Sequence, residues 1–220
     1  MSGLIVVPAY FPPAAEAWAE LADTSPHLAV VNVDGGPGPA RAPDFAAVAG
    51  RARAAGVTLA GYVDTAYGRR PPGEVAAEVR RYRAWYGVRR VFLDRAAAGR
   101  RQLGHYARTV RAVRAEGAEY VVFNHGVHPD PGYAALADLL VTFEGPWSAY
   151  RSLRAPEWVM EAGAGRFCHL VYATPRHALC EVLLQARRCN AQACYVTDRD
   201  QPNPWDDLPG YYGLEVQAFG

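Results

Sequence analysis

Eight short runs of apolar and β-branched residues recur along this chain of 220 residues, and they constrain its fold more than any other feature. Each run is continuously apolar instead of alternating between apolar and polar residues, which is typical of parallel strands buried on both faces. We therefore predict eight buried strands, over residues 4–8, 29–33, 58–63, 90–94, 120–124, 139–143, 167–172 and 194–197.

Helical patterns fill most of the intervals between these runs. The spacing of apolar residues predicts helices over 44–55, 74–86, 101–116 and 175–190, and shorter ones near 133–138 and 147–153. Proline favours the start of a helix and glycine its end. Accordingly, Pro43 precedes the first predicted helix, and Gly56, Gly87 and Gly117 follow the first three. Strands that alternate with helices form either a closed (β/α)₈ barrel or an open doubly wound sheet.

The count of eight strands favours the closed barrel. No glycine-rich phosphate loop follows the first run, where a dinucleotide-binding sheet would carry one. Glycines at 35, 36 and 38 follow the second run, but the intervening proline lacks an N–H donor, and we interpret the segment as a turn. We predict an α/β fold: one compact (β/α)₈ TIM barrel spanning residues 1–220 as a single domain.

The balance of charge argues against two classes of partner. A net charge of +1 provides no strong field for nucleic acid or for an anionic membrane, and no apolar run is long enough to span a bilayer. Met1 leads almost directly into the first strand without a signal-peptide pattern. We expect a cytoplasmic protein, or a secreted one if its start has been trimmed. We expect no nucleic-acid or membrane partner, and a monomer or a weak homodimer.

Polar and aromatic residues stand where the predicted strands end. In a (β/α)₈ barrel all strands end on one face, and that face carries the chemistry. Asn32 lies near the end of the second run, and Trp205 lies beyond the eighth. The candidate site residues in chain order are Tyr10, Tyr62, Asp64, Tyr67, Asp94, Asn124, His125, Glu144, Trp147, His169, Tyr172 and Asp198.

This combination of side chains suits a carbohydrate. Aromatic rings pack on the apolar face of a pyranose, while carboxylates and amides bind its hydroxyl groups. Glycoside hydrolysis also requires two carboxyl groups beside the scissile bond, one protonated and one ionised. Asp94 and Glu144 lie at the ends of two strands that are separated by one other strand. Barrel geometry places side chains at such positions about 5–10 Å apart. We expect these two to be the catalytic pair and the other candidates to bind substrate.

The acidic residues also have structural interpretations. Asp94 could belong to a structural ion pair, and Glu144 is a lone acid after a largely apolar run. Asp64 and Asp198 could each cap a loop, since aspartate readily accepts hydrogen bonds from nearby backbone N–H groups.

The histidines are similarly open to two interpretations. His169 lies between apolar residues and could be a barrel histidine with satisfied hydrogen bonds. His125 and His128 could ligate a metal, but no matching third ligand accompanies them, and we favour hydrogen bonding within a loop. We expect no metal and no organic cofactor.

Seven segments of the chain together carry a family signature. They are VPAYFPP at 7–13, VVNVDGGPGP at 30–39, GYVDTAYGRRP at 61–71, VFLDR at 91–95, FNHGVHPDPGY at 123–133, LADLLVTFEGPW at 136–147 and HLVYATP at 169–175. Over nearly its whole length the chain resembles the spherulation-specific family 4 (spherulin-like) proteins.

The resemblance implies a (β/α)₈ fold and endo-acting hydrolysis of galactosamine-containing polysaccharide such as galactosaminogalactan, as in characterised fungal members. In the family pattern the fourth strand ends in an Asp-Glu pair and the sixth in a Glu, which correspond here to Asp94 and Glu144. Arg95 stands in place of the second acid of the pair. We expect this fixed cation to lower the pKa of neighbouring acids and to repel a protonated hexosamine.

These observations favour a glycoside hydrolase-like enzyme that acts on a hexosamine-containing, galactosamine-type glycan or glycoside by two-carboxylate acid/base chemistry. Two alternatives stay open. One is a carbohydrate-binding barrel without catalysis, in which Arg95 has compromised the acid pair. The other is an intracellular lyase, transferase or isomerase acting on a small polar metabolite in the same cleft, which a closed pocket would favour over a long groove.

Overall fold

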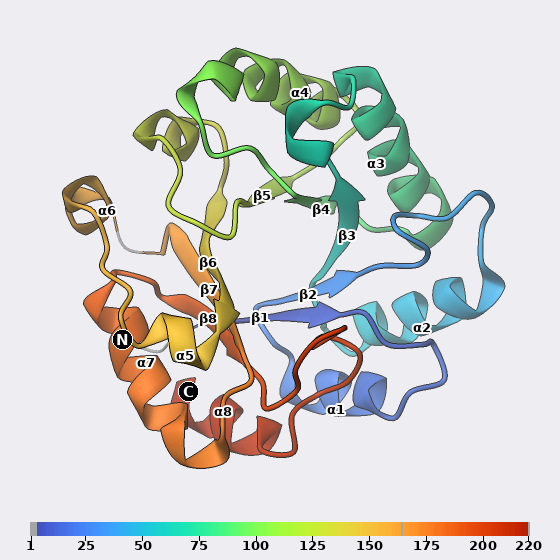
Figure 1. Ribbon diagram of the computed structural model, residues 1–220. Helices are drawn as coiled ribbons and strands as arrows, with labels where there is room; N and C mark the ends of the chain where they lie inside the picture. Colours follow the sequence, from blue (N-terminus) through green and yellow to red (C-terminus); the bar gives the residue numbers. More distant parts are fainter. Residues whose placement is uncertain (1–3, 164, 220) are drawn as a thin grey trace.

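The computed structural model describes residues 4–163 and 165–219, in which eight parallel strands close into a barrel (Figure 1). Each strand is hydrogen-bonded to the next along the chain, and β1 meets β8 to close the ring. The predicted (β/α)₈ barrel is confirmed, and the open sheet is excluded. The strands are β1 (Leu4–Ala9), β2 (Leu28–Val31), β3 (Leu59–Asp64), β4 (Arg90–Asp94), β5 (Tyr120–Asn124), β6 (Leu139–Pro146), β7 (Phe167–Tyr172) and β8 (Ala193–Val196).

Helices surround the barrel and cover its outer face (Figure 1). The four longer predicted helices are present as α2 (Pro43–Ala54), α3 (Pro72–Tyr86), α4 (Leu103–Ala115) and α7 (Leu179–Arg188). Two 3₁₀ turns, η2 (Arg100–Gln102) and η4 (Arg176–Ala178), precede α4 and α7 and account for their earlier predicted starts. The two predicted short helices correspond to a 3₁₀ turn, η3 (Pro131–Ala135), and to α5 (Trp147–Tyr150).

Four further elements lack a counterpart in the sequence prediction: α1 (Ala17–Thr24), η1 (Ala66–Gly68), α6 (Glu157–Glu161) and α8 (Tyr212–Phe219). The ends of α1 lack the residues that usually mark a helix in a sequence. The helix begins without a side-chain cap, and it ends at Ser25, which adopts a left-handed conformation that glycine usually supplies. No helix in the described part of the chain is both long and apolar enough to cross a membrane.

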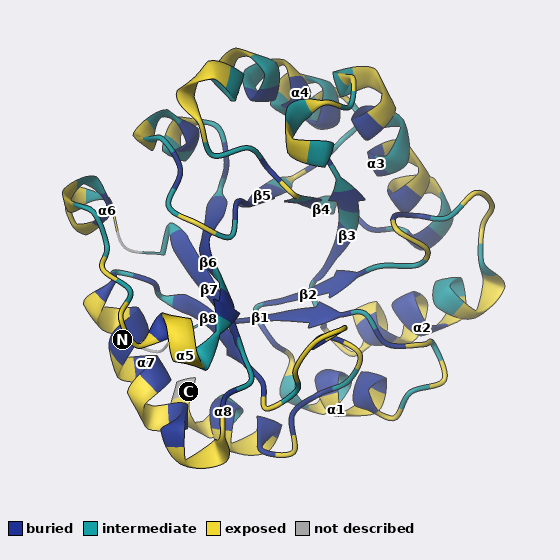
Figure 2. Cartoon of the chain, viewed as in Figure 1, coloured by how far each residue is buried: buried dark blue, intermediate teal, exposed yellow. Residues whose placement is uncertain are grey.

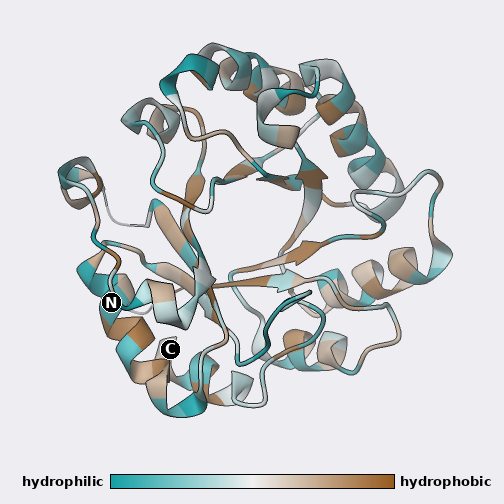
Figure 3. Ribbon diagram, viewed as in Figure 1, coloured by the Kyte–Doolittle hydropathy of each residue, from teal (hydrophilic) through white to brown (hydrophobic). Residues whose placement is uncertain are grey.

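The strands are buried inside the ring of helices, and the helices expose only their outward faces. The strands are dark blue and the outward faces of the helices are yellow in Figure 2, and in Figure 3 the most hydrophobic colours gather on the strands. Strand residues such as Val6, Phe92 and Val122 are fully buried. Their burial supplies the main driving force for closing the barrel.

A glycine fixes how α3 packs on the barrel. A Cβ atom at Gly61 of β3 would lie 2.5 Å from the ring of Tyr82, so only glycine leaves room for that ring. Tyr82 is almost fully buried there, and its hydroxyl donates a hydrogen bond to the carbonyl of Val31 at 3.0 Å. Because side chains alternate along a strand, Tyr62 then faces the opposite side, toward the barrel interior.

The junction between β1 and β8 opens toward the C-terminal end of the barrel. The two strands pair only at Leu4 and Ile5 of β1. Beyond that point the backbone N–H of Val196 donates instead to the buried carboxyl of Glu215 at 2.9 Å. The backbone N–H of Tyr10 donates to the carbonyl of Trp205 at 3.1 Å. The segment after β8 therefore fills the opening and lies across the end of β1 (Figure 1).

Candidate active site

Two acids and one amide meet at the C-terminal end of the barrel. The side-chain nitrogen of Asn124, at the end of β5, donates to Asp94 Oδ1 at 2.7 Å and to Glu144 Oε2 at 2.5 Å. The Asn124 carbonyl oxygen accepts from the backbone N–H of Gly126 at 3.1 Å, which fixes the orientation of the amide. The three residues come from β4, β5 and β6, so adjacent strand ends bring the two acids together.

The shared nitrogen sets the separation of the acids. Since Asp94 Oδ1 and Glu144 Oε2 lie 2.7 and 2.5 Å from one atom, they can be no farther apart than these distances laid end to end, about 5.2 Å. Carboxyl groups about 5–5.5 Å apart are typical of retaining glycosidases, and inverting ones need about 6.5–9.5 Å. Asp94 Oδ1 and Glu144 Oε2 therefore lie no farther apart than the lower end of the roughly 5–10 Å range expected from the sequence.

Burial governs the protonation of both acids. Desolvation raises the pKa of Asp94, opposed by hydrogen bonds from the Arg95 backbone, Tyr62 and Asn124. Desolvation also raises the pKa of Glu144, opposed by its hydrogen bond from Asn124, and the charge of Asp94 raises it further. The two groups therefore hold a proton more readily than exposed carboxyls do, mainly because they are buried, and the charge of Asp94 adds to this effect at Glu144.

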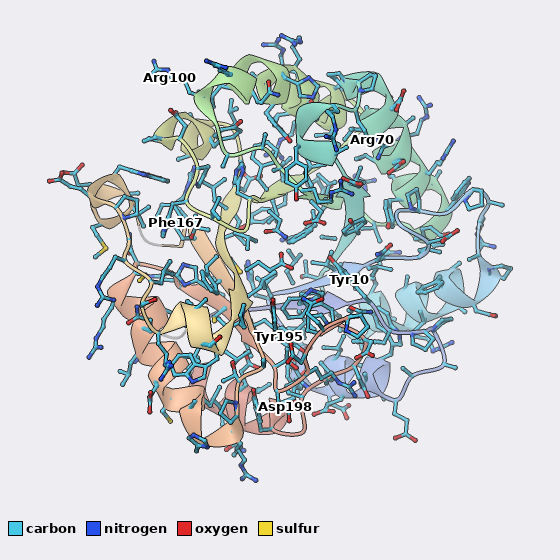
Figure 4. The ribbon with its side chains drawn as sticks, in the orientation of Figure 1. Tyr10, Arg70, Arg100, Phe167, Tyr195 and Asp198 are labelled. Atoms are coloured by element: carbon cyan, nitrogen blue, oxygen red, sulfur yellow. The ribbon has the colours of Figure 1, made fainter. Side chains whose placement is uncertain are left out.

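Aromatic residues surround the acids. Tyr62 donates its hydroxyl hydrogen to Asp94 Oδ2 at 2.9 Å, and its ring meets that of Tyr10 edge to face at 5.5 Å between centroids. Tyr10 points toward the centre of the barrel in Figure 4. Trp205 donates a side-chain hydrogen bond to Glu144 and packs against the ring of Tyr172. The site therefore combines apolar ring surfaces with the polar side chains of Asp94, Asn124 and Glu144.

Two hollows flank the acid pair, and Asp94, Asn124, Glu144 and Gln201 line both of them. We call them the outer and the inner hollow; each encloses about 270 Å³. The outer hollow is also lined by Tyr67, Arg95, His125, Gly126 and Tyr172. The inner hollow is also lined by Tyr10, Asn32, Tyr62, Leu170 and the segment 202–205.

Arg95 points away from the acid pair. Its guanidinium lies 3.0 Å from Asp64 Oδ2 and 5.2 Å from the centre of the Tyr67 ring. Arg95 adopts a left-handed backbone conformation, with φ of 49°, which turns the chain sharply at the end of β4. The expected lowering of the pKa by this cation is not found at Asp94 or Glu144: burial raises the pKa of each, and the guanidinium charge is not among the causes that act on either.

The structure thus gathers most of the predicted site residues. Asp94, Asn124, Glu144, Tyr10, Tyr62, Tyr67, His125 and Tyr172 line one or both hollows. Asp64 lies at the rim, where it pairs with Arg95 and accepts from the backbone N–H of Ala66 at 2.6 Å. The ion pair and the loop cap considered for the acids are therefore both found at Asp64.

Besides Asp64, three predicted substrate-binding residues line neither hollow. Trp147 begins α5 and packs beside Tyr150, because β6 continues to Pro146 and carries the following residue away from the barrel axis. His169 is fully buried and shares a 2.7 Å hydrogen bond with the Tyr150 hydroxyl, while its neighbour Leu170 lines the inner hollow. Asp198 is exposed in the segment after β8 (Figure 4).

The histidines near the site are held neutral. Burial lowers the pKa of His125 to about 4, and its Nδ1 lies 3.3 Å from the carbonyl of Ala96. Burial also lowers the pKa of His128. Among residues 4–163 and 165–219, no three or more His, Cys, Asp or Glu side chains are grouped so that they could hold a metal ion.

The segment 201–204 is the part of the site that the sequence analysis missed. Gln201 lines both hollows, and Pro202, Asn203 and Pro204 line the inner one. The segment has no hydrophobic periodicity, so nothing in its sequence distinguishes it from an ordinary polar loop. The only local signal was Trp205, a large aromatic residue beyond the last strand.

Comparisons by sequence identify relatives of the chain. A model of the family described as spherulation-specific family 4 matches residues 4–219. Spherulin-4 of Physarum polycephalum is 32% identical over 164 residues, which cover 70% of this chain and 48% of that protein. The chain therefore spans about half the length of this curated relative.

Comparisons of structure identify the same architecture in solved proteins. Sph3 of Aspergillus clavatus, crystallised in complex with GalNAc, has a TM-score of 0.87 at 23% identity and covers 99% of this chain and 97% of its own. Active domain 2 of a thermostable chitinase from Pyrococcus furiosus, crystallised with chito-oligosaccharides, has a TM-score of 0.61 at 12% identity and covers 99% and 95%. The fold is therefore one that glycoside hydrolases use.

Proposed function

The chain belongs to spherulation-specific family 4, and from this membership we propose that it is a glycoside hydrolase acting on a hexosamine-containing glycan or glycoside. The observation that carries the proposal is the sharing of the Asn124 amide by Asp94 and Glu144, beside two accessible hollows. That separation matches the two-carboxylate chemistry of a double displacement. The hexosamine class is drawn from Sph3, whose crystal structure contains GalNAc.

In the proposed reaction Glu144 donates a proton to the glycosidic oxygen while Asp94 attacks the anomeric carbon. Asp94 suits the nucleophile because both of its oxygens accept hydrogen bonds, from Tyr62 and Asn124, which hold an ionised carboxylate in place. Glu144 suits the proton donor because burial and the charge of Asp94 both raise its pKa.

The second half of the reaction reverses these roles. A water molecule attacks the anomeric carbon of the glycosyl ester on Asp94, and Glu144, now ionised, accepts the proton of that water. Asp94 leaves as a carboxylate and Glu144 is again protonated. Each residue thereby returns to its starting state without any further reactant.

The surrounding rings would hold the sugar. Tyr10 and Tyr62 present ring edges and faces to the inner hollow, and Tyr172 lines the outer one. Such rings pack on the apolar face of a pyranose, while the Asn32 amide can bind its hydroxyl groups.

The proposal is tested by incubating the protein with aryl hexosaminides of both anomeric configurations and with deacetylated galactosaminogalactan. We expect release of the aryl group or of reducing ends, and we expect Glu144→Gln to slow this release by about 10²–10⁴-fold. The absence of hydrolysis on every one of these substrates, by a protein shown to be folded, would contradict the proposal. Binding of oligosaccharide without turnover would instead identify a carbohydrate-binding barrel.

A further inference from the structure

We infer that Thr65 and Tyr106 are positioning residues, whose hydroxyl groups hold the chain turn that follows β4 and so keep the Asp94 carboxylate aimed at the sugar. The inference rests on the proposed glycosidase function and deepens it, since it names the residues that orient the nucleophile. Thr65 is 1% exposed, Tyr106 is fully buried, and neither residue lines a hollow. They therefore act through Asp94 and not by contact with substrate.

The turn after β4 has a backbone conformation that its residues do not favour. Arg95 is left-handed, with φ of 49°, which is uncommon for any residue other than glycine. The segment after the neighbouring strand β3 is left-handed too, with φ of 47° at Ala66 and 57° at Tyr67. Such conformations persist only where the surrounding structure holds them. The hydrogen bonds around Arg95 therefore keep the turn in place.

Thr65, which follows β3, bonds to both carbonyl groups of this turn. Its Oγ1 lies 2.9 Å from the carbonyl oxygen of Asp94 and 2.9 Å from that of Arg95. Its backbone N–H also donates to the Asp94 carbonyl at 2.9 Å, and the N–H of Tyr67 donates to the Arg95 carbonyl at 2.7 Å. One side chain thus joins two consecutive peptide groups of β4 and the turn to the end of β3.

Tyr106 of α4 sets the direction in which the Thr65 hydroxyl points. The Tyr106 hydroxyl lies 2.8 Å from Thr65 Oγ1 and accepts a hydrogen bond from the backbone N–H of Ala97 at 2.9 Å. Because carbonyl oxygens can only accept, the single hydroxyl hydrogen of Thr65 points to the turn, and Tyr106 is the donor to Thr65. The hydrogen bonds therefore run in one direction, from Ala97 through the two hydroxyl groups to the carbonyls of the turn.

The turn brings a hydrogen-bond donor to the nucleophile. The backbone N–H of Arg95 donates to the Asp94 carboxylate and lowers its pKa. Tyr62 and Asn124 donate to the same carboxylate from their side chains. Rotation of Arg95 out of its left-handed conformation would move the backbone donor away and leave the two side-chain donors in place. The two hydroxyl groups therefore favour the ionised form of Asp94, which attacks the sugar.

Other titratable and charged groups lie around Asp94 on β1, β3, β6 and the turn itself. They are Tyr10, Tyr62, Asp64, Arg95 and Glu144. Burial has the largest effect on the pKa of Asp94 and raises it, and the charge of Asp64 raises it further. These groups are held by contacts with one another, with Asp94 and with Asn124. Removal of either hydroxyl group leaves those contacts in place, so a change in the pKa of Asp94 reports the turn.

The test compares variants that each remove one buried hydroxyl group. Thr65→Val and Tyr106→Phe remove the two positioning groups, and Thr65→Ser keeps the hydroxyl. Tyr86→Phe is the matched control, because the Tyr86 hydroxyl also accepts from a backbone N–H, that of Ala42 at 3.1 Å, and donates to a neighbour, the Pro37 carbonyl at 2.9 Å. Tyr86 is buried and lines neither hollow, so its loss changes the packing of α3 and not the turn.

We expect Thr65→Val and Tyr106→Phe to lower kcat by about tenfold with KM within about twofold, because the nucleophile is misaligned and the sugar-binding walls are unchanged. The acidic limb of the kcat/KM profile should move to higher pH by about one unit, since Asp94 loses a donor to its ionised form. Thr65→Ser should restore both values, and Tyr86→Phe should leave both unchanged. An acidic limb that stays in place in Tyr106→Phe, or that moves equally in Tyr86→Phe, would overturn the inference.

A measurement without substrate separates the inference from the proposed function. Carbon-13 NMR of labelled carboxyl groups gives the pKa of Asp94, with its signal identified by its loss in Asp94→Asn. A higher pKa in Tyr106→Phe than in the unsubstituted protein would support the positioning role, even if no hexosaminide is hydrolysed and the proposed function is rejected. An equal pKa in the two proteins would overturn the inference and leave the hydrolase activity to its own test.

Discussion

The guanidinium of Arg95 lies 3.0 Å from the carboxylate of Asp64, on the exposed rim of the outer hollow. The cation that replaces the second acid of the family pattern is therefore neutralised by a neighbour from β3. It contributes to the rim while Asp94 keeps its own partners, Tyr62 and Asn124. The replacement should consequently change which substrates approach the site more than it changes the reaction.

Arg95→Glu should shift substrate preference toward free-amino hexosaminides, whose ammonium group the cation repels. One charge at about 4 Å in a water-like medium is worth about 1 kcal/mol. Arg95→Glu replaces a repulsive charge by an attractive one, a change of about 2 kcal/mol, so the ratio of kcat/KM for free-amino over N-acetylated substrate should rise about thirtyfold. The measurement is made at low salt, where screening is weakest. Arg187→Glu on the exposed surface of α7 is the control for net charge, and an equal change in both variants would reject the interpretation.

Asn124→Ala and Tyr62→Phe should separate the two limbs of the pH–rate profile. The hydrogen bond from Asn124 lowers the pKa of both acids, so its removal raises both, and both limbs of the profile should move to higher pH. Tyr62 bonds only to Asp94, so Tyr62→Phe should move the acidic limb upward and leave the basic limb in place.

The measurement is kcat/KM across pH for the three proteins. Loss of the Asn124 donor should also lower kcat by about 10²-fold, the usual effect of removing one donor to a developing charge. A Tyr62→Phe profile whose basic limb alone moves would reverse the roles proposed for Asp94 and Glu144.

Hydrolysis should proceed with retention of anomeric configuration. The Asn124 amide holds Asp94 Oδ1 and Glu144 Oε2 within about 5.2 Å of each other, which favours direct attack by the Asp94 carboxylate on the sugar. Proton NMR spectra recorded in the first minutes of hydrolysis identify the anomer formed before mutarotation. An initial product of opposite configuration would show that the acids separate when substrate binds.

Glu215→Gln should stabilise the protein at neutral and alkaline pH. Burial raises the pKa of Glu215 well above its ordinary value, so the native state binds its proton more tightly than the unfolded state does. The stability contributed by this group is present below its unfolded pKa and is lost as pH rises through its folded pKa. The amide keeps an oxygen for the N–H of Val196 and has no charge to bury.

Thermal unfolding at pH 4 and pH 8 checks this prediction. The gain in Tm should be larger at pH 8, and Glu215→Leu, which leaves the Val196 N–H without its acceptor, should destabilise the fold by about 1–3 kcal/mol at both. Destabilisation by Glu215→Gln at pH 8 would show that the carboxylate is ionised and paired in the native state.

The strand ends made the acid pair predictable from sequence. Asp94 ends a short apolar run, and Glu144 follows one, so the barrel fold alone brings them to one face. The same reasoning from strand ends was not sufficient for Trp147 and His169, which line neither hollow. A bulge between Val141 and Phe143 and the continuation of β6 to Pro146 decide which side chains face inward, and neither feature has a sequence signal.

The segment 201–205 could not be predicted either. Its position depends on the opening between β1 and β8 and on the hydrogen bond from Tyr10 to Trp205, both of which are contacts between distant parts of the chain. Periodicity describes local structure, and a polar loop without it can lie anywhere on the surface.

The central claim is that Asp94 and Glu144 together cleave a glycosidic bond. The most direct test is kcat/KM for Asp94→Asn and Glu144→Gln on a hexosaminide that the unsubstituted protein cleaves, with unfolding curves to show that the fold is intact. Each substitution should reduce kcat/KM by about 10²–10⁴-fold. Full activity in either folded variant would contradict the claim.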